Sequence, residues 1–571
     1  MSDNTVDLTS ASWGPGEFEQ FTAAQTRSRS KAGTATGRNG AVTVAYGAYA
    51  ARAGLEALKQ GGNAIDAALT TALTQVALNA GAPISYFGIM SLVYLDAKSG
   101  RVHTMNAEWN TVAGETDPLS IPGGITMTGV DGVAGTTVSG RTAMVGGFMK
   151  GVDAAHARFG RLPFECLFQP AIEAAEQGTP VNESVDMAYR MRAADLARLP
   201  ATREALLKPD GSPYRLGETL RQPKLAETLK RIAADGVGYM YGGPWGAKLV
   251  EAVQADGGHM TLKDLTDYEV HWADALTADI GGYALATTPW PNAGGVAMIE
   301  AQHLAAVSGL LDQPHWTVSG ESLRKALDIT RLITLSYLPQ EATAKLFPGL
   351  DFSPEARVTR EHAEQLWARI QDGAALPWQP IAPRHSDDVV AVDADGNIAA
   401  ITHSINCVLW GKTAINIDGI SIGDPAAHQQ QVLASVRPGD RLPAPTETGV
   451  LLKDGVPVLG FASMGAGLHQ RTFQGLLNYM RFGMSIEDAV NTPDFFMPTF
   501  HPDGTATANF GAGEYDHAVL HASGVPWHEA ASSEEARFTG EGLWVAIERD
   551  PATGVLNAVS HNRNNSDAVA F

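Results

Sequence analysis

The chain has 571 residues, which is longer than a single hydrophobic core usually serves and predicts two or more lobes or one large layered α/β domain. The hydrophobic fraction of 44% and the charged fraction of 18% are those of a soluble globular protein. The 62 acidic and 41 basic side chains give a net charge of -21, which would repel phosphate backbones and anionic lipid surfaces. We therefore expect neither a nucleic-acid partner nor a membrane partner.

The start of the chain and its two cysteines limit the compartment and the kind of site. Residues 1–30 are polar and lack the basic start and apolar run of a secretory signal, so we expect a cytoplasmic protein. Cys166 and Cys407 lie far apart and without metal-type spacing. We expect both to be core residues, and we expect no disulfide, no metal site and no cofactor.

The predicted elements follow one another in a mixed α/β order. In chain order they are a strand at 41–45, helices at 46–60 and 63–79, a hairpin of strands at 89–95 and 100–105, mainly helices over 147–234, strands near 280–287, and a helix at 296–308. Asn63 is a suitable cap for the second helix, with Asp66 in its first turn. Residues 373–383 contain three prolines and no periodic pattern, which predicts an accessible loop.

A second hairpin follows that loop, with strands at 387–393 and 398–405 joined at Asp395-Gly396. A two-residue turn would place Ser386 opposite Ile405, beside Ser404 and Asn406. A one-residue bulge would place Ser404 or Asn406 directly opposite Ser386. In either case three polar side chains converge at one end of the hairpin.

These residues resemble the γ-glutamyltransferase family of N-terminal-nucleophile hydrolases. The segment SDDVVAVDADGN at 386–397 aligns without gaps with the start of the family's small subunit, where Thr normally stands first. Asn406, in THSIN, lies where the family has its Asn, and Ser404 lies where the family has a second Thr. Further matching motifs are GGNAIDAAL at 61–69, VGGFMKGVDAAHARFGRLPF at 145–164, TTPWPNAGG at 287–295 and GVLLKDGVPVLGFASMGAG at 449–467.

The resemblance implies a four-layer αββα sandwich assembled from two pieces of one precursor. The large subunit would run from Met1 to His385 and the small subunit from Ser386 to Phe571. Because strands from both pieces would share one core, cleavage should not release the fragments.

A serine at a new N-terminus has a chemical advantage over an ordinary serine. A hydroxyl is a weak nucleophile, and an α-amino group with a pKa of about 8 is a suitable neighbouring base. In this scheme the Ser386 hydroxyl first adds to the carbonyl of the His385-Ser386 bond, and water then resolves the ester. The freed amine accepts the hydroxyl proton when Ser386 attacks a substrate carbonyl.

The oxyanion of each tetrahedral intermediate needs hydrogen-bond donors. Ser463 to Gly467 precede a predicted helix at 468–482, and backbone N–H groups at a helix start are unpaired. The family uses two consecutive glycines, which correspond to Gly465 and Ala466. Ala466 can replace a glycine if its φ is negative, because the donor is the backbone.

Other polar residues near Ser386 leave alternatives open. Asp387 and Asp388 either orient the new ammonium, bind a cationic group of the substrate, or are solvated loop acids. Asp393 to Asn397 superficially resembles a calcium loop, but the hairpin explains it and the later Glu ligand is missing. Trp410 either lines a pocket or packs in the core.

The resemblance fails at the positions that bind a γ-glutamyl substrate. The family's carboxylate-binding Arg would fall in the stretch Asn106, Ala107, Glu108 and Trp109, which contains no Arg, and its serine pair falls on Ala444 and Pro445. The family's four-glycine run is replaced by Ser85-Tyr86-Phe87-Gly88, whose aromatic rings fill space, which predicts a reshaped pocket.

We therefore expect an autocatalytically processed amidohydrolase or acyltransferase that acts on a small amide other than a γ-glutamyl compound. Three alternatives remain: a genuine γ-glutamyltransferase with other carboxylate anchors, a C–C bond hydrolase of a biosynthetic pathway, and an uncleaved non-catalytic relative. The sequence leaves open whether the protein forms a homo-oligomer.

Overall fold

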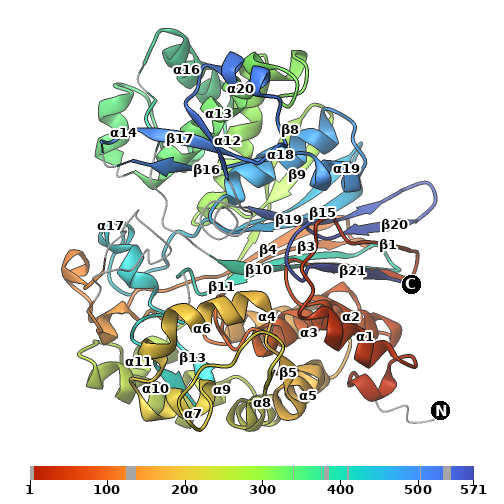
Figure 1. Ribbon diagram of the computed structural model, residues 1–571, viewed down its shortest axis with the longest axis vertical. Coiled ribbons are helices and arrows are strands. Elements are labelled where there is room, and N and C mark those ends of the chain that lie inside the picture. Colours follow the sequence, from red (N-terminus) through yellow and green to blue (C-terminus); the bar gives the residue numbers. More distant parts are fainter. Residues whose placement is uncertain are drawn as a thin grey trace.

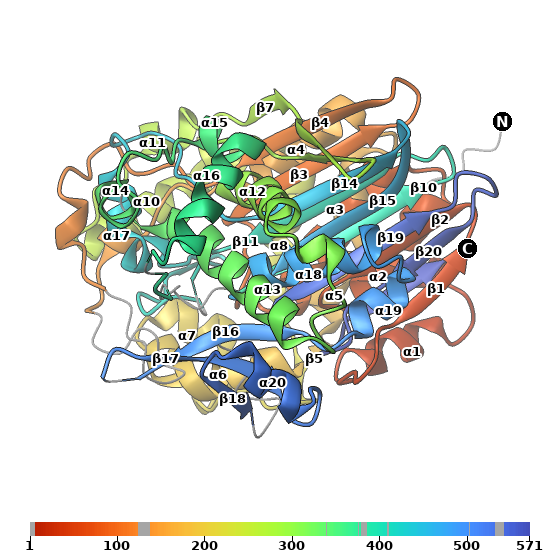
Figure 2. The same ribbon diagram turned by 90° about the horizontal axis from the view of Figure 1, so that it is seen from above.

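Two stacked β-sheets form the centre of the molecule, and helices cover the outer face of each (Figures 1 and 2). The computed structural model describes residues 6–123, 137–338, 340–374, 376–378, 385–407, 410–501, 503–530 and 542–571. The layers follow the order helices, sheet, sheet, helices, which is the expected αββα sandwich. Most of the loop expected at 373–383 lies outside the described residues.

The first sheet contains the hairpin that begins at Ser386. Its seven strands lie in the order β21-β2-β10-β11-β3-β4-β7. Their bounds are β21 Asp567–Ala570, β2 Gly40–Val44, β10 Ser386–Asp393, β11 Ile398–Ser404, β3 Ile89–Asp96, β4 Arg101–Ala107 and β7 His271–Asp274. The helices that cover it include α1 Glu17–Ala24, α2 Ala48–Lys59, α3 Ala64–Leu78, α4 Phe148–Phe159, α5 Gln169–Gln177 and α8 Pro223–Asp235.

The second sheet lies on the other face of the first. Its seven strands have the order β1-β20-β19-β15-β14-β9-β8. Their bounds are β1 Thr34–Gly37, β20 Leu556–Val559, β19 Leu543–Arg549, β15 Val456–Met464, β14 Glu447–Lys453, β9 Tyr283–Thr287 and β8 Leu276–Ile280. The helices on its outer side include α12 Ala293–Val307, α13 Gly320–Ile333, α16 Arg360–Gln371, α18 Leu468–Met480, α19 Ile486–Asn491 and α20 His517–Ser523.

The remaining elements extend the two helical layers. Helices of the first layer are α6 Glu183–Leu196, α7 Pro200–Leu206, α9 Gly238–Tyr241, α10 Pro244–Ala255 and α11 Leu262–Thr266, with α17 Gln430–Ala434 beside the sandwich. The second layer also carries α14 Gln340–Leu346 and α15 Pro354–Arg357. Small sheets are formed by β5 Thr179–Pro180 with β6 Thr219–Leu220, by β12 Asn416–Ile417 with β13 Ile420–Ser421, and by β16 Phe495–Phe500, β17 Ala506–Gly511 and β18 Trp527–Ala530.

Local sequence explains where several elements begin and end. Asn63 caps α3 in a reciprocal capping box with Asp66, as the sequence predicts. Gly281 and Gly282 both have positive φ and make the turn that separates β8 from β9. Helix α12 begins at Ala293, before the predicted start, because the Asn292 side chain accepts a hydrogen bond from the Gly295 amide.

Side chains of β10 alternate between two different cores. Val389 and Ala391 pack against the helices of the first layer. Val390 and Val392 pack between the sheets, together with Ala462 of β15. A residue's even or odd position in this strand therefore decides whether it faces the helices or the other sheet.

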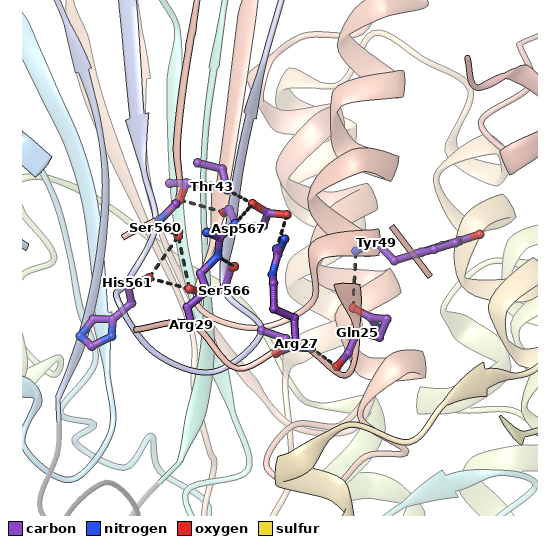
Figure 3. A network of polar contacts seen from close by, with 12 residues as sticks. Gln25, Arg27, Arg29, Thr43, Tyr49, Ser560, His561, Ser566 and Asp567 are labelled. Atoms are coloured by element: carbon purple, nitrogen blue, oxygen red, sulfur yellow. Dashed lines mark hydrogen bonds and ion pairs between the residues drawn. The ribbon is translucent and has the colours of Figure 1, made fainter. Parts of the chain in front are cut away.

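Segments before and after Ser386 are interleaved throughout the sandwich. In the first sheet β10 lies between β2 and β11, and in the second β20 lies between β1 and β19. Near the chain ends, Arg27 and Arg29 both form ion pairs with Asp567, at 2.8 and 2.6 Å (Figure 3). Such strand pairing and ion pairs would hold the two pieces together after a cut.

Two further expectations concern cysteines and membranes. Cys166 and Cys407 are buried free thiols, as predicted. Across the described residues, no helix combines the length and the apolar character that a membrane span requires.

Candidate active site

The hairpin at Ser386 has a register one residue away from the two-residue-turn prediction. Ser386 lies opposite Ser404, and Val392 lies opposite Ile398. The turn is longer by one residue because the Gly396 amide bonds to the Asp393 carbonyl at 3.0 Å while Gly396 adopts a φ of 87°. The alternative with Ser404 opposite Ser386 is therefore correct, and the pairing with Ile405 is wrong.

Four polar residues meet at one end of this hairpin: His385, Ser386, Ser404 and Asn406. Ser386 is the first residue of β10 and is only 6% exposed. The Ser404 hydroxyl donates a hydrogen bond to the His385 carbonyl at 2.9 Å, and the backbone N–H of Asn406 donates to the Ser404 oxygen at 2.8 Å. A fixed hydroxyl thus contacts the carbonyl of the bond that the sequence predicts to be cleaved.

The backbone after Ser404 bends sharply. Asn406 has a φ of 49°, a left-handed conformation that Asn adopts more readily than most residues. Among the described residues its buried side-chain nitrogen finds no hydrogen-bond acceptor. Trp410 packs against Tyr189 and donates to the Ala80 carbonyl, so it is a core residue and not a pocket wall.

Asp387 and Asp388 are fully buried, which contradicts the reading of both as solvated loop acids. Burial raises the pKa of the Asp387 carboxyl well above its usual range, and the adjacent Asp388 raises it further. Burial also raises the pKa of Asp388 well above the usual range. The Thr402 hydroxyl partly opposes that increase, and the charge of Glu447 adds to it.

The turn between β15 and α18 has the geometry expected for an oxyanion site. Gly465 has a φ of 94°, which favours glycine, whereas Ala466 does not have a positive φ. Within the described part of the chain, neither the Gly465 amide nor the Ala466 amide donates to a backbone or side-chain acceptor. The condition under which Ala466 can replace a glycine is therefore met.

Contacts between the sheets bring this turn to the end of the sandwich that carries Ser386. Glu447 of β14 lies opposite Ser463, two residues before Gly465. The Thr446 hydroxyl, at the start of β14, donates to Glu108 at 2.8 Å. Glu108 in turn belongs to the cross-strand row that begins at Ser386.

That row crosses four strands of the first sheet. Ser386 faces Ser404, and Ser404 faces Ile89. Glu108 directly follows Ala107, which lies opposite Met90, so Glu108 continues the row beyond β4. Burial raises the pKa of the Glu108 carboxyl to about 7, although the Thr446 hydroxyl and the charge of Arg441 lower it.

The positions expected to bind substrate serve the packing of the fold. A Cβ on Gly151 of α4 would lie 2.9 Å from the Cβ of Ala107, so Ala107 faces the helices and has little free space around it. Ala444 and Pro445 lie against the turn that precedes α12, where the Ala293 amide donates to the Ala444 carbonyl at 2.7 Å. None of these three side chains offers a donor for a carboxylate.

The aromatic residues at 85–88 also pack into the helical layer. The Tyr86 hydroxyl donates to the Leu73 carbonyl at 2.7 Å. The Phe87 ring lies 5.3 Å from the ring of Trp245. These rings fill the core behind β3, so the expected reshaping of the pocket does not arise from side chains that project into it.

Arg441 is the residue of this region that sequence reasoning missed. Its guanidinium donates to the Asn106 side-chain oxygen at 2.5 Å and to Asn110 at 2.7 Å, and it lies 4.7 Å above the ring of Tyr268. Its side chain thereby fixes the end of β4 to the segment that precedes β14. No local pattern reveals this role, because the partners are more than 170 positions away in the chain.

Comparisons with known proteins identify the family of this chain. The family model of the gamma-glutamyltranspeptidases matches residues 50–571. The chain is 29% identical over 478 residues to a glutathione hydrolase proenzyme of Pseudomonas aeruginosa, a match that covers 79% of this chain and 82% of the relative. It is equally 29% identical over 478 residues to the acylase ACY 1 proenzyme of a Pseudomonas species, which covers 80% of this chain and 82% of that protein.

A solved structure supports the fold. The crystal structure of a cephalosporin acylase from Bacillus halodurans superimposes with a TM-score of 0.75 and 21% identity, covering 94% of this chain and 97% of that one. At this identity the likeness concerns the fold alone. With the family model matched over nearly the whole chain, this protein belongs to the gamma-glutamyltranspeptidase family of N-terminal-nucleophile hydrolases.

Proposed function

We propose that the chain cleaves itself between His385 and Ser386, and that the mature protein transfers or hydrolyses the acyl group of a small amide other than a γ-glutamyl compound. The observation that carries the proposal is the hydrogen bond from the Ser404 hydroxyl to the His385 carbonyl at 2.9 Å. That carbonyl precedes a nucleophile-type residue at the start of a buried strand. The name proenzyme in both 29% identical relatives supports the same reading.

Self-cleavage would begin with attack of the Ser386 Oγ on the His385 carbonyl carbon. The Ser404 hydroxyl is placed to stabilise the negative charge on the carbonyl oxygen, because it already donates to that atom. The backbone N–H of Asn406 donates to the Ser404 oxygen and holds it in place. Breaking the C–N bond leaves an ester on the Ser386 Oγ and a free α-amine, and water then hydrolyses the ester to a carboxylate at His385.

In the mature protein the α-amine of Ser386 would act as the base. It accepts the Oγ proton while Oγ bonds to the substrate carbonyl carbon, and it returns that proton to the leaving amine. The amides of Gly465 and Ala466 are suitable donors to the oxyanion. Water or a second amine then releases the acyl group from Ser386.

The proposed substrate class depends on the absence of a carboxylate-binding group from the wall formed by residues 106–109, Ala444 and Pro445. Recognition of an α-carboxylate is strongest with a bidentate Arg, and the stretch from Asn106 to Trp109, where the family has that Arg, contains none. Arg441 is nearby, but its donors already bind Asn106, Asn110 and the Glu269 carbonyl. Together with Ala444 and Pro445, this wall offers a γ-glutamyl group no free cation among the described residues.

A second candidate is a glutathione hydrolase with a different carboxylate anchor, which the 29% identical P. aeruginosa relative favours. A γ-glutamyl anilide assay separates the two candidates. Robust turnover of the anilide would refute the proposed substrate class and leave the nucleophile assignment intact.

The deciding experiment is a denaturing gel with intact mass measurement on the wild type and on Ser386→Ala. We expect two fragments from the wild type, the smaller beginning Ser386-Asp387-Asp388, and one intact chain from the variant. A single uncut chain from the wild type would instead support a non-catalytic relative. A panel of primary amides, acylated amines and β-lactam side-chain amides would then narrow the substrate.

A further inference from the structure

Two adjacent buried acids beside Ser386 face opposite sides of the first sheet. Asp387 lies on the helical side, with Val389 and Ala391. Asp388 lies on the side of the second sheet, with Val390 and Val392. Ser386 has the parity of Asp388, so these two side chains share the space between the sheets.

Asp387 has a structural role that accounts for its position. Its Oδ1 accepts the Tyr46 amide at 3.0 Å and the Asp388 amide at 2.9 Å. These bonds hold the end of β2 and the entry to α2 against the start of β10. Asp387 is therefore a suitable control for any effect of its neighbour.

Within the described chain, the Asp388 side chain accepts a hydrogen bond from one side chain and from no backbone amide. Its Oδ1 accepts the Thr402 hydroxyl at 2.6 Å, and among the described residues its buried Oδ2 has no hydrogen-bond partner, which is also true of the Asp387 Oδ2 on the helical side. Thr402 lies opposite Asp388, and Ser91 lies opposite Thr402, also with a buried hydroxyl that finds no partner in the described chain. The unpaired Oδ2 of Asp388 therefore belongs to the residue two positions after Ser386, on the same face of β10.

We propose that Asp388 is the charge partner of the α-ammonium group of Ser386, and so a positioning residue for the base of the mature protein. The inference rests on the proposed function, because the ammonium exists only after cleavage at Ser386. The α-carbons of residues two apart in a strand are separated by about 7 Å, so the Asp388 side chain can approach the Ser386 nitrogen. Opposite charges about 4–6 Å apart stabilise each other.

The charges balance in both states of the chain. Before cleavage the Ser386 nitrogen is a neutral amide, and burial raises the pKa of the Asp388 carboxyl, which favours its neutral form. After cleavage the amine can take a proton while Asp388 carries the negative charge. The form that reacts has lost this proton to solvent, which leaves a neutral amine beside the Asp388 carboxylate. When Ser386 attacks, the Oγ proton moves to that amine, and the resulting ammonium lies beside the carboxylate until it protonates the leaving group.

Other titratable groups surround this pair and are all retained in the Asp388→Asn variant. They are Asp387 and His403 on the helical side, Glu447 on β14, His469 on α18, Glu108 beyond β4, and His385 before the cut. Burial lowers the pKa of His403 to about 3, so that ring is neutral. The acids favour a protonated amine, so the removal of Asp388 alone should lower the pKa of the Ser386 amine.

The experiment compares the wild type with Asp388→Asn, Asp387→Asn and Thr402→Val. Cleavage is read by intact mass. The pH dependence of Ser386 labelling by phenylmethylsulfonyl fluoride reports the activated nucleophile, and competitive labelling of the small fragment with acetic anhydride reports the pKa of its α-amine. Asparagine is nearly isosteric with a protonated aspartic acid, so Asp388→Asn should fold and cleave.

We expect the acidic limb of both pH profiles to move to lower pH by about one unit in Asp388→Asn. Thr402→Val keeps the carboxyl but removes its hydrogen-bond donor, and should move the limb in the same direction by less. Asp387→Asn should leave the limb unchanged. An unchanged limb in a cleaved Asp388→Asn protein, or failure of that variant alone to cleave, overturns this inference; an uncleaved wild type overturns the proposed function itself.

Discussion

The two ends of the row from Ser386 to Glu108 differ in the chemical groups that they offer. At the Ser386 end, the Ser404 hydroxyl donates to the His385 carbonyl, and the backbone bends at Asn406, as the proposed self-cleavage requires. At the Glu108 end, Ala107 and Ala444 contribute only to packing. A nucleophile must meet strict geometry, whereas the wall that binds the acyl group can change with the substrate. Perturbation of each end should therefore have different consequences.

The largest effect is expected at the Ser404 hydroxyl. Ser404→Ala should slow self-cleavage by about 10²–10³-fold, because the His385 oxyanion loses a fixed donor. Cleavage of freshly synthesised protein, followed on a gel against time, measures the rate. Ser91→Ala is the matched control, since its hydroxyl also lies between the sheets but is remote from His385. Equal rates in the two variants would contradict a role for Ser404.

The next effect concerns stability at the other end of the row. Burial holds the pKa of Glu108 at about 7 in the folded chain, against 4.5 for an ordinary Glu. Between these pH values the unfolded chain releases a proton that the folded chain retains, so Glu108 makes the fold less stable as pH rises, with no further change above about pH 7. Glu108→Gln should remove this cost, a gain of up to about 3 kcal/mol at pH 8 and little at pH 4.

Urea unfolding of the wild type and Glu108→Gln at both pH values tests the linkage. Glu251→Gln, at an exposed position, is the control. A difference between the wild type and Glu108→Gln that does not vary with pH would show that Glu108 does not titrate in this range.

A smaller effect is expected when an arginine is introduced into the stretch where the family carries one. Ala107→Arg should destabilise the fold by about 1–3 kcal/mol, because position 107 faces Gly151 across a tight contact. It should not produce γ-glutamyl turnover. Thermal melting and a γ-glutamyl anilide assay measure the two results, with Ala113→Arg at an exposed site as the control. Turnover of the anilide would show that this wall can still accept a carboxylate anchor.

The sequence predicts the residues at the two ends of this row with different success. Asp395-Gly396 located the hairpin, and Ser404 and Asn406 were correctly expected near Ser386. The register of the two-residue turn was wrong by one residue, and the open alternative with Ser404 opposite Ser386 was correct, because composition does not distinguish a two-residue turn from a turn with an extra residue at positive φ. That one residue decides which side chain faces Ser386.

Contacts between distant segments could not be predicted. The opposite orientations of Asp387 and Asp388 follow from strand parity once Ser386 is known to begin β10. Arg441 and Thr446, in contrast, meet Asn106 and Glu108 only through the stacking of two sheets. No periodicity or turn signal in the chain encodes such a meeting, so the burial of Glu108 and its raised pKa became evident only in three dimensions.

The smallest and sharpest effects are expected at the oxyanion turn, where one substitution mimics the family and its neighbour breaks a backbone requirement. Ala466→Gly restores the family's second glycine and should change the rate of Ser386 sulfonylation by less than about threefold, because only a backbone amide acts there. Gly465→Ala forces a side chain into a φ of 94°, which costs about 1–2 kcal/mol and should lower the rate about tenfold. Mass spectrometry of the labelled small fragment measures both rates. If Ala466→Gly lowered the rate more than Gly465→Ala, the methyl group of Ala466 would matter more than its backbone amide. The turn would then be a packing element and not an oxyanion site.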